Sequence, residues 1–161
     1  VWSRFRWPNP SRVWSLYNMP DYAAAYNTIL TRFKSQMDSS RPNVKISWPN
    51  IDFDPEADFD TSSDEAWARV TVQGGEAFQA SLGGTGYRRW RHPGLVTVQV
   101  FSPMGEGLQT SLDVADDVVA ALEGVTTSSV EIHASSVNPI GRDGAFFQTN
   151  VRTPFRFDNQ R

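Results

Sequence analysis

Cysteine is absent from this 161-residue chain, and histidine occurs only at His92 and His133. Without cysteine there is no disulfide, no thiolate metal ligand and no cysteine nucleophile. Neither histidine has a second ligand at metal-site spacing or an evident partner for a catalytic triad, and no GxSxG elbow is present. These absences predict a protein that is not an enzyme and that has no catalytic residue, no cofactor and no metal site.

Long apolar runs are also missing, because none approaches the roughly 20 residues that span a bilayer. Charges and prolines interrupt the first eight residues, so we expect no signal peptide and no membrane partner. The net charge of −3 argues against a dedicated nucleic-acid binder, and we expect no sequence-specific nucleic-acid partner.

The length predicts one domain, residues 21–161, preceded by an arm, residues 1–20. Trp2, Phe5 and Trp7 alternate with arginines in this arm, and its prolines forbid a long helix. The arm could fold back over its own domain, or its aromatic residues could dock on a neighbouring subunit or partner. Stacking on single-stranded nucleic acid also fits the composition, but the acidic total disfavours it.

Two segments have the apolar spacing of amphipathic helices. The first begins at Pro20–Asp21 and ends at residues 39–43, and the second runs from Leu108 to a C-terminal glycine, Gly124. The apolar stripe of the first contains Tyr22, Ala25, Tyr26, Ile29, Leu30, Phe33 and Met37, and that of the second contains Leu108, Leu112, Ala115, Val118, Val119 and Leu122.

Alternating apolar and polar residues predict strands at 44–48, 66–73, 95–101, 129–135 and from about Phe146 onward. Residues 102–107 and 137–144 have turn chemistry, and residues 74–94 fit a long hairpin. Pro154 predicts an edge position or the end of regular pairing. The fold class is therefore α+β: a mainly antiparallel sheet with two amphipathic helices on one face, a long basic hairpin and an extended N-terminal arm.

Acidic residues concentrate between Asn50 and Glu65, where no EF-hand spacing is present. This segment is either a solvated loop or, as we prefer, a surface that meets a basic partner. Its acids are Asp52, Asp54, Glu56, Asp58, Asp60, Asp64 and Glu65.

A basic counterpart lies on the return limb of the hairpin, at Arg88, Arg89 and Arg91 around Trp90. The preceding Gly83–Gly86 run could cradle an anion, although it lacks the lysine and hydroxyl of a P-loop. His92 beside Pro93 is expected to be a solvated loop residue, and His133 to point outward.

The stretch from Gly86 to Gly107, with its arginines, its VTVQVF strand, its PMGEG turn and the helix that follows, resembles the central signature of the tail-terminator, or tail-completion, proteins of long-tailed phages. The FQTNVRTPFRF ending is in a compatible order, so the resemblance covers roughly residues 21–157 and leaves out the arm. It implies a structural virion protein, made in the host cytoplasm and located at the head-proximal end of the tail. Such a protein forms a six-membered ring that caps the tail tube, ends elongation and presents the head-joining surface.

The partners implied are other copies of the chain, the tail-tube protein and the head–tail connector or neck protein. A ring needs two unlike patches on each subunit, and the chain offers Asp52, Asp54, Asp58 and Asp60 against Arg88, Arg89, Trp90 and Arg91, with Trp2, Phe5 and Trp7 as arm contacts. Two alternatives remain open: another neck or tail adaptor, and a small anion-binding domain that uses the Gly83–Gly86 loop.

Overall fold

The structure is a computed structural model that describes residues 21–160. The arm contacts predicted at Trp2, Phe5 and Trp7 lie outside the described residues and stay predictions.

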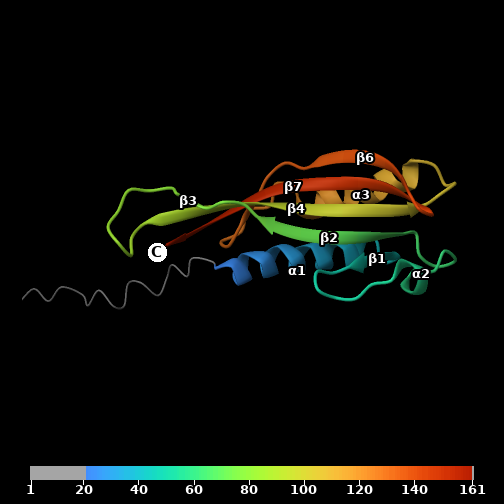
Figure 1. Cartoon of the computed structure of the whole chain (residues 1–161), viewed down its shortest axis with the longest axis horizontal. Coiled ribbons are helices and arrows are strands. Elements are labelled where there is room, and N and C mark those ends of the chain that lie inside the picture. Colours follow the sequence, from blue (N-terminus) through green and yellow to red (C-terminus); the bar gives the residue numbers. More distant parts are fainter. Residues whose placement is uncertain (1–20, 161) are drawn as a thin grey trace, which may run out of the picture.

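The centre of the fold is a seven-stranded sheet with the order β1-β2-β4-β7-β5, in which β3 also pairs with β4 and β6 with β7. Only β1 and β2 run parallel, and the other pairs are antiparallel. Figure 1 shows β4 and β7 running side by side along the length of the molecule. The strands are β1 Val44–Ser47, β2 Ala66–Gly74, β3 Phe78–Gln79, β4 Arg89–Pro103, β5 Glu131–Ile132, β6 Ser136–Asp143 and β7 Phe146–Gln160.

Two long helices, α1 (Tyr22–Ser40) and α3 (Gln109–Leu122), cover one face of this sheet. The carboxylate of Asp21 caps α1 by accepting a hydrogen bond from the Ala24 N–H at 2.8 Å. The residues that the helices bury in the core are Ala25, Ile29, Phe33, Met37, Val114, Ala115, Val118, Ala121 and Leu122. The predicted α+β class, with a mostly antiparallel sheet and helices packed on it, is confirmed.

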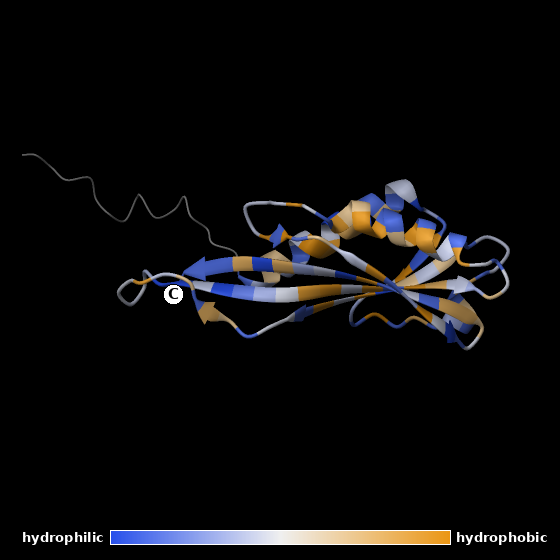
Figure 2. Cartoon of the chain, turned by 90° about the horizontal axis from the view of Figure 1, so that it is seen from above, coloured by the Kyte–Doolittle hydropathy of each residue, from blue (hydrophilic) through white to orange (hydrophobic). Residues whose placement is uncertain are grey.

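Strand alternation builds the sheet side of this core. Val70, Val98 and Val151 are register partners across three neighbouring strands, and all three are buried beneath the helices. Figure 2 shows the alternating hydrophobic and hydrophilic bands along the long strands. One face of each strand therefore enters the core, and the other faces away from the helices.

A second, smaller aromatic cluster lies on the face away from the helices. Trp67 of β2 stacks on Phe101 of β4, with ring centroids 4.0 Å apart. Phe53 and Phe59 come from the acidic segment, which also contains the short helix α2 (Pro55–Asp58), and they join Phe146 in covering the stacked pair. The acidic segment is therefore packed against the sheet rather than being a free loop.

The turn predicted at residues 137–144 is wrong, because this segment forms β6 and pairs with β7. Pro139 and Gly141 suggested a turn, but they flank a register shift in a strand whose only partner among the described residues is β7. A proline is tolerated there because an edge strand needs no donor on its outer side.

Of the two outcomes predicted from Pro154, the edge position is wrong, whereas the end of regular pairing holds on one side of β7. β7 is paired on both sides, with β4 along one edge and with β6 and then β5 along the other. β6 pairs with β7 as far as Arg152, and β5 pairs with it from Phe155 onward. Pro154 lies in the gap between the two pairings, where its lack of an N–H costs the sheet no hydrogen bond. Its carbonyl still accepts a hydrogen bond from the His133 N–H at 2.8 Å.

Candidate functional site

The first candidate surface is the hairpin end, which consists of residues 75–92 and the paired end of β7, residues 157–160. Here β4 continues past the core and pairs with β3 on one side and with β7 on the other, so the end protrudes beyond the start of α1 (Figure 1). A side chain at Gly94, at the root of this end, would collide with the ring of Phe155. Glycine there lets the two long strands stay paired into the protrusion.

The three arginines predicted for an interface differ in how they are held. Arg91 makes a bidentate ion pair with Asp158, at 2.9 and 3.0 Å, and Arg89 reaches the same carboxylate at 3.9 Å. The hydrogen bond from Arg91 holds the pKa of Asp158 below its usual value. Arg88 donates from Nε to the Gly83 carbonyl at 3.0 Å. The charge of Arg91 is thus neutralised within the chain, whereas the charges of Arg88 and Arg89 are largely unpaired.

His92 is not the solvated loop residue that the sequence suggested, because it is 3% exposed on the core face of β4. Its Nε2 lies 3.0 Å from Asn159 Oδ1 and its Nδ1 lies 2.8 Å from the Tyr22 hydroxyl. The ring also stacks on Phe157, with centroids 4.7 Å apart. His92 therefore ties the beginning of α1 to the protruding strands.

A mainly apolar groove of about 380 Å³ lies where α1 meets the hairpin end. Its lining residues are Tyr22, Ala77, Thr85, Arg88, Trp90 and His92. Trp90, predicted as an interface residue, is half-buried in this groove rather than fully exposed. Beside it Phe78 is 51% exposed and Leu82 is 98% exposed, so the hairpin end combines positive charge with apolar side chains.

The second candidate surface is the acidic segment, residues 50–65, which the aromatic cluster fixes to the sheet. Several of its carboxylates shape its own backbone: Asp54 caps α2, Asp58 accepts from the Asp54 N–H at 2.8 Å, and Asp60 accepts from the Ser62 N–H and hydroxyl. The hydrogen bonds from Ser62 lower the pKa of Asp60. The segment therefore presents its charges in a fixed arrangement.

The acids of this segment fall into two groups. Glu65 pairs with Arg41 at 2.7 Å and Asp64 lies 3.9 Å from Lys45, so these two are partly neutralised. Asp52, Asp54, Glu56, Asp58 and Asp60 form no ion pair with any residue in 21–160 and are exposed. Within the same range, no group of three or more His, Cys, Asp or Glu side chains is placed to hold a metal ion.

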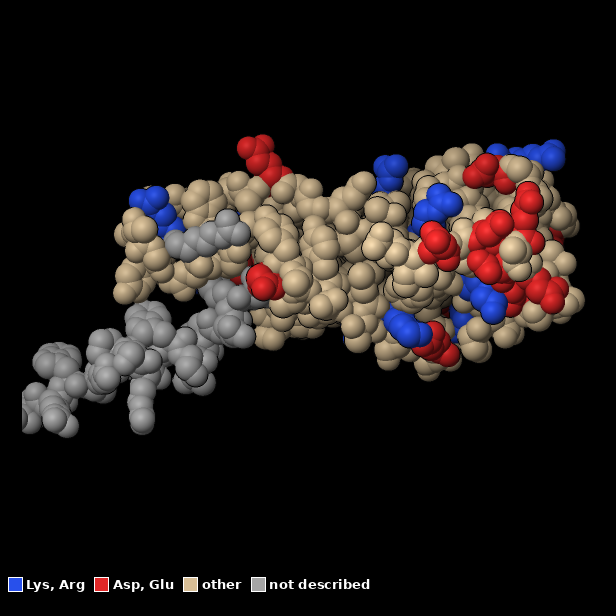
Figure 3. All heavy atoms as spheres, turned by 60° about the horizontal axis from the view of Figure 1, so that its bottom comes forward, with Lys and Arg blue, Asp and Glu red and all other residues tan. Residues whose placement is uncertain are grey.

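The two surfaces lie at opposite ends of the molecule. Arg89 begins the 15-residue strand β4, and its last residue, Pro103, pairs with Phe146, which contacts Phe59 of the acidic segment. At about 3.3 Å per residue the strand spans about 45 Å. Figure 3 shows the acidic cluster at one end and Arg or Lys atoms at the tip of the other. Screening acts over about 8–10 Å, so neither charged end can neutralise the other within one chain.

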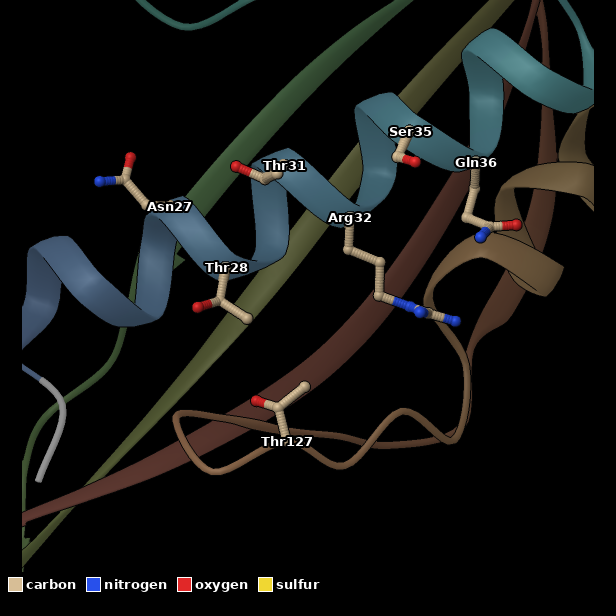
Figure 4. Close-up of a pocket in the computed structure, with 7 residues that line it drawn as sticks. All are labelled: Asn27, Thr28, Thr31, Arg32, Ser35, Gln36 and Thr127. Atoms are coloured by element: carbon tan, nitrogen blue, oxygen red, sulfur yellow. The ribbon is translucent and has the colours of Figure 1, made fainter. Parts of the chain in front are cut away.

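A second hollow, of about 490 Å³, lies along α1 (Figure 4). Hydroxyl and amide side chains of α1 line it together with Arg32 and Thr127. Arg32 reaches toward the end of α3 and donates to the Ala121 carbonyl at 3.0 Å. Arg32 therefore pairs with a carbonyl at the C-terminal end of α3, so its presence in the hollow is explained by a structural role.

Sequence reasoning did not identify Asp158 and Tyr22 as the residues that bind Arg91 and His92 of the hairpin end. Asp158 lies 67 residues from the arginine that it binds, and only the β4–β7 register brings the two together. The signal that the sequence did contain, just past the middle of the chain, is the alternation of Arg89 and Arg91, which places both side chains on one face of a strand.

The comparisons agree with this architecture. A family model described as phage tail terminator protein matches residues 27–155. The chain belongs to the phage tail terminator family. One solved structure is similar to this chain, with 18% sequence identity and a TM-score of 0.58. The match covers 84% of this chain and 92% of the chain in that structure, so the two share a fold. No curated protein matches the sequence.

Membership in the tail terminator family, as the sequence resemblance suggested, makes the chain a structural protein of a phage tail. It is a virion component that contacts other tail or head proteins. No helix within residues 21–160 has the length and apolar character needed to cross a membrane.

Proposed function

We propose that copies of this chain associate head-to-tail, hairpin end to acidic segment, and close into a ring of six that caps the tail tube. The ring ends tail elongation and presents the surface that joins the head. The observation that supports this proposal is the placement of two unlike, oppositely charged surfaces about 45 Å apart on one rigid sheet. A heterologous contact between unlike patches generates a ring whenever its rotation closes.

The charges set register in this arrangement, and the apolar side chains supply the affinity. Exposed ion pairs contribute only about 0–1 kcal/mol each, but complementary charge steers encounter and suppresses wrong partners. Phe78, Leu82 and Trp90 at the hairpin end, with Ile51 at the acidic end, supply apolar area for the contact.

Light scattering of the purified protein, alone and with isolated tail tubes, tests this proposal, together with electron micrographs of the same samples. We expect rings, and rings bound at one end of each tube. A strict monomer that ignores tubes at high concentration contradicts it. In a strain that lacks the gene, tails of uncontrolled length support a terminator, whereas tails of normal length that fail to join heads support a neck adaptor instead.

A further inference from the structure

We propose that residues 13–20, just before the described part of the chain, bind in the groove beside Tyr22 and Trp90 of their own subunit. This segment then holds the basic residues 1–12 against the hairpin end. The docking requires no neighbouring subunit, so it goes beyond the proposed ring and can be tested without it.

The first observation is where the chain leaves the described structure. Asp21 caps α1, and the next residue, Tyr22, is itself a wall of the groove. Eight residues reach at most about 28 Å when extended, so residues 13–20 are long enough to reach across the groove from its edge. A segment tethered this closely has an effective concentration in the millimolar range.

The second observation is the chemistry of the groove. Its lining includes the aromatic residues Tyr22 and Trp90. Among the lining residues that lie within 21–160, Arg88 is the one with a charged side chain, and none carries a carboxylate. An uncharged apolar segment fits such a site, and an arginine-rich one does not. Residues 13–20 read VWSLYNMP and contain no charged residue, whereas residues 1–12 contain Arg4, Arg6 and Arg12.

Geometry favours the subunit's own segment over that of a neighbour. In a head-to-tail contact, the hairpin end faces the neighbour's acidic segment, and that neighbour's own residue 21 lies at its far end, about 45 Å along its sheet. The tether within the same subunit is therefore the shorter by far. With residues 13–20 in the groove, the arginines of residues 1–12 add to Arg88 and Arg89 at the end that meets the acidic partner.

The absence of cysteine makes a clean disulfide test possible. The full-length double variant Leu16→Cys with Ala77→Cys places one thiol in the segment and one in the groove wall. The matched control, Leu16→Cys with Ser39→Cys, uses an exposed position near the other end of α1, about 25 Å from Tyr22 at about 1.5 Å per residue. Under mild oxidation of dilute protein, we expect the groove pair to form an intramolecular disulfide at least tenfold faster than the control pair.

Two further measurements make the test decisive. Mixing the single variants Leu16→Cys and Ala77→Cys distinguishes a neighbour's segment, because a disulfide-linked dimer formed as fast as the intramolecular link overturns the proposal. Equal rates for the groove and control pairs also overturn it.

In hydrogen exchange of the full chain, the double variant Trp14→Ser and Leu16→Ser should reduce protection at residues 77–90 at least tenfold, and unchanged protection contradicts docking. If the link forms in a protein that assembles no ring, this inference stands and the proposed function fails.

Discussion

Phe59 packs edge-to-face against Phe146, with ring centroids 5.4 Å apart and an interplanar angle of 78°. This contact fixes the acidic segment to the start of β7, and the contact of Phe53 with Trp67 fixes it to β2. The positions of the exposed carboxylates therefore depend on buried rings rather than on the carboxylates themselves.

Replacing Phe59 by Ala should lower the free energy of unfolding by about 3 kcal/mol, because a ring that is 91% buried is lost and a cavity is left. Urea denaturation followed by circular dichroism measures this change. The same variant should weaken assembly although it removes no charge. For the stability measurement, Ile51→Ala at a 63% exposed position in the same segment is the control, with an expected change within about 0.5 kcal/mol.

Reversing Arg88 and Arg89 to Glu should weaken assembly at least tenfold while leaving the fold intact, because both side chains lie at the protruding end. Sedimentation velocity at several salt concentrations measures the effect, and the loss should be larger at low salt. Combining this variant with Asp52→Arg and Glu56→Arg, two exposed positions whose side chains do not shape the backbone of the segment, should restore part of the assembly. Lys34→Glu on α1 is the matched control. If the variant with Glu at positions 88 and 89 assembles as well as the wild type, charge does not guide the contact.

The Arg91–Asp158 pair should make stability depend on pH in a defined direction. The pKa of Asp158 is lowered in the fold, so the unfolded chain binds a proton more readily. The stabilisation is therefore present above the ordinary aspartate pKa of about 3.9 and is lost as the pH falls through the lowered value. Asp158→Asn should cost about 1 kcal/mol at pH 7, and its difference from wild type should shrink below about pH 4.

Denaturant melts of wild type and Asp158→Asn between pH 2.5 and pH 7 measure this difference. Asp38→Asn is the control, because its pair with Lys34 is more than half exposed and should contribute less than about 0.5 kcal/mol. A difference between wild type and Asp158→Asn that stays constant with pH would show that the ion pair does not provide the stabilisation.

Gly94→Ala should destabilise the protein by about 1–3 kcal/mol, since an added Cβ has no room beside Phe155 and lies 2.7 Å from the Gln73 carbonyl. Gly84→Ala at the hairpin tip provides the contrast, because nothing lies within 4 Å of its added Cβ and its φ is not positive. Differential scanning calorimetry should show a lower Tm for Gly94→Ala and almost no change in Tm for Gly84→Ala. Equal Tm values would mean that the strand pairing adjusts freely at Gly94.

The fold was predictable where local periodicity and tertiary burial agree. Val96, Val98 and Val100 alternate in sequence and are all buried under the helices, and Ile29, Phe33 and Met37 recur at helical spacing and are also buried. The sequence missed Val114 and Ala121 on the buried stripe of α3, and it placed Leu108 there although Leu108 is 42% exposed. The helix type was clear, but its exact face depends on packing against β4 and β7.

The remaining differences arise where distant strands decide the environment of a residue. Pro139, Gly141 and Pro154 have turn-like or edge-like preferences, and only the pairing of β7 shows why they are tolerated. His92 is polar and precedes a proline, yet Tyr22 and Asn159 satisfy both ring nitrogens inside the protein. The charged residues of the candidate site were found from sequence because charge runs are local, whereas Asp158 was not, since its partner comes from another strand.

β7 follows every other described element in sequence, and yet it fills the middle of the sheet, between β4 on one side and β5 and β6 on the other. During synthesis one edge of β4 therefore stays unpaired until residues 146–160 leave the ribosome. The sheet can be completed only after nearly all of the described chain has been made. The last residues of β7 also carry Asp158 and Asn159, which hold the hairpin end in place. A partly synthesised chain therefore lacks the finished hairpin end on which the proposed subunit association depends.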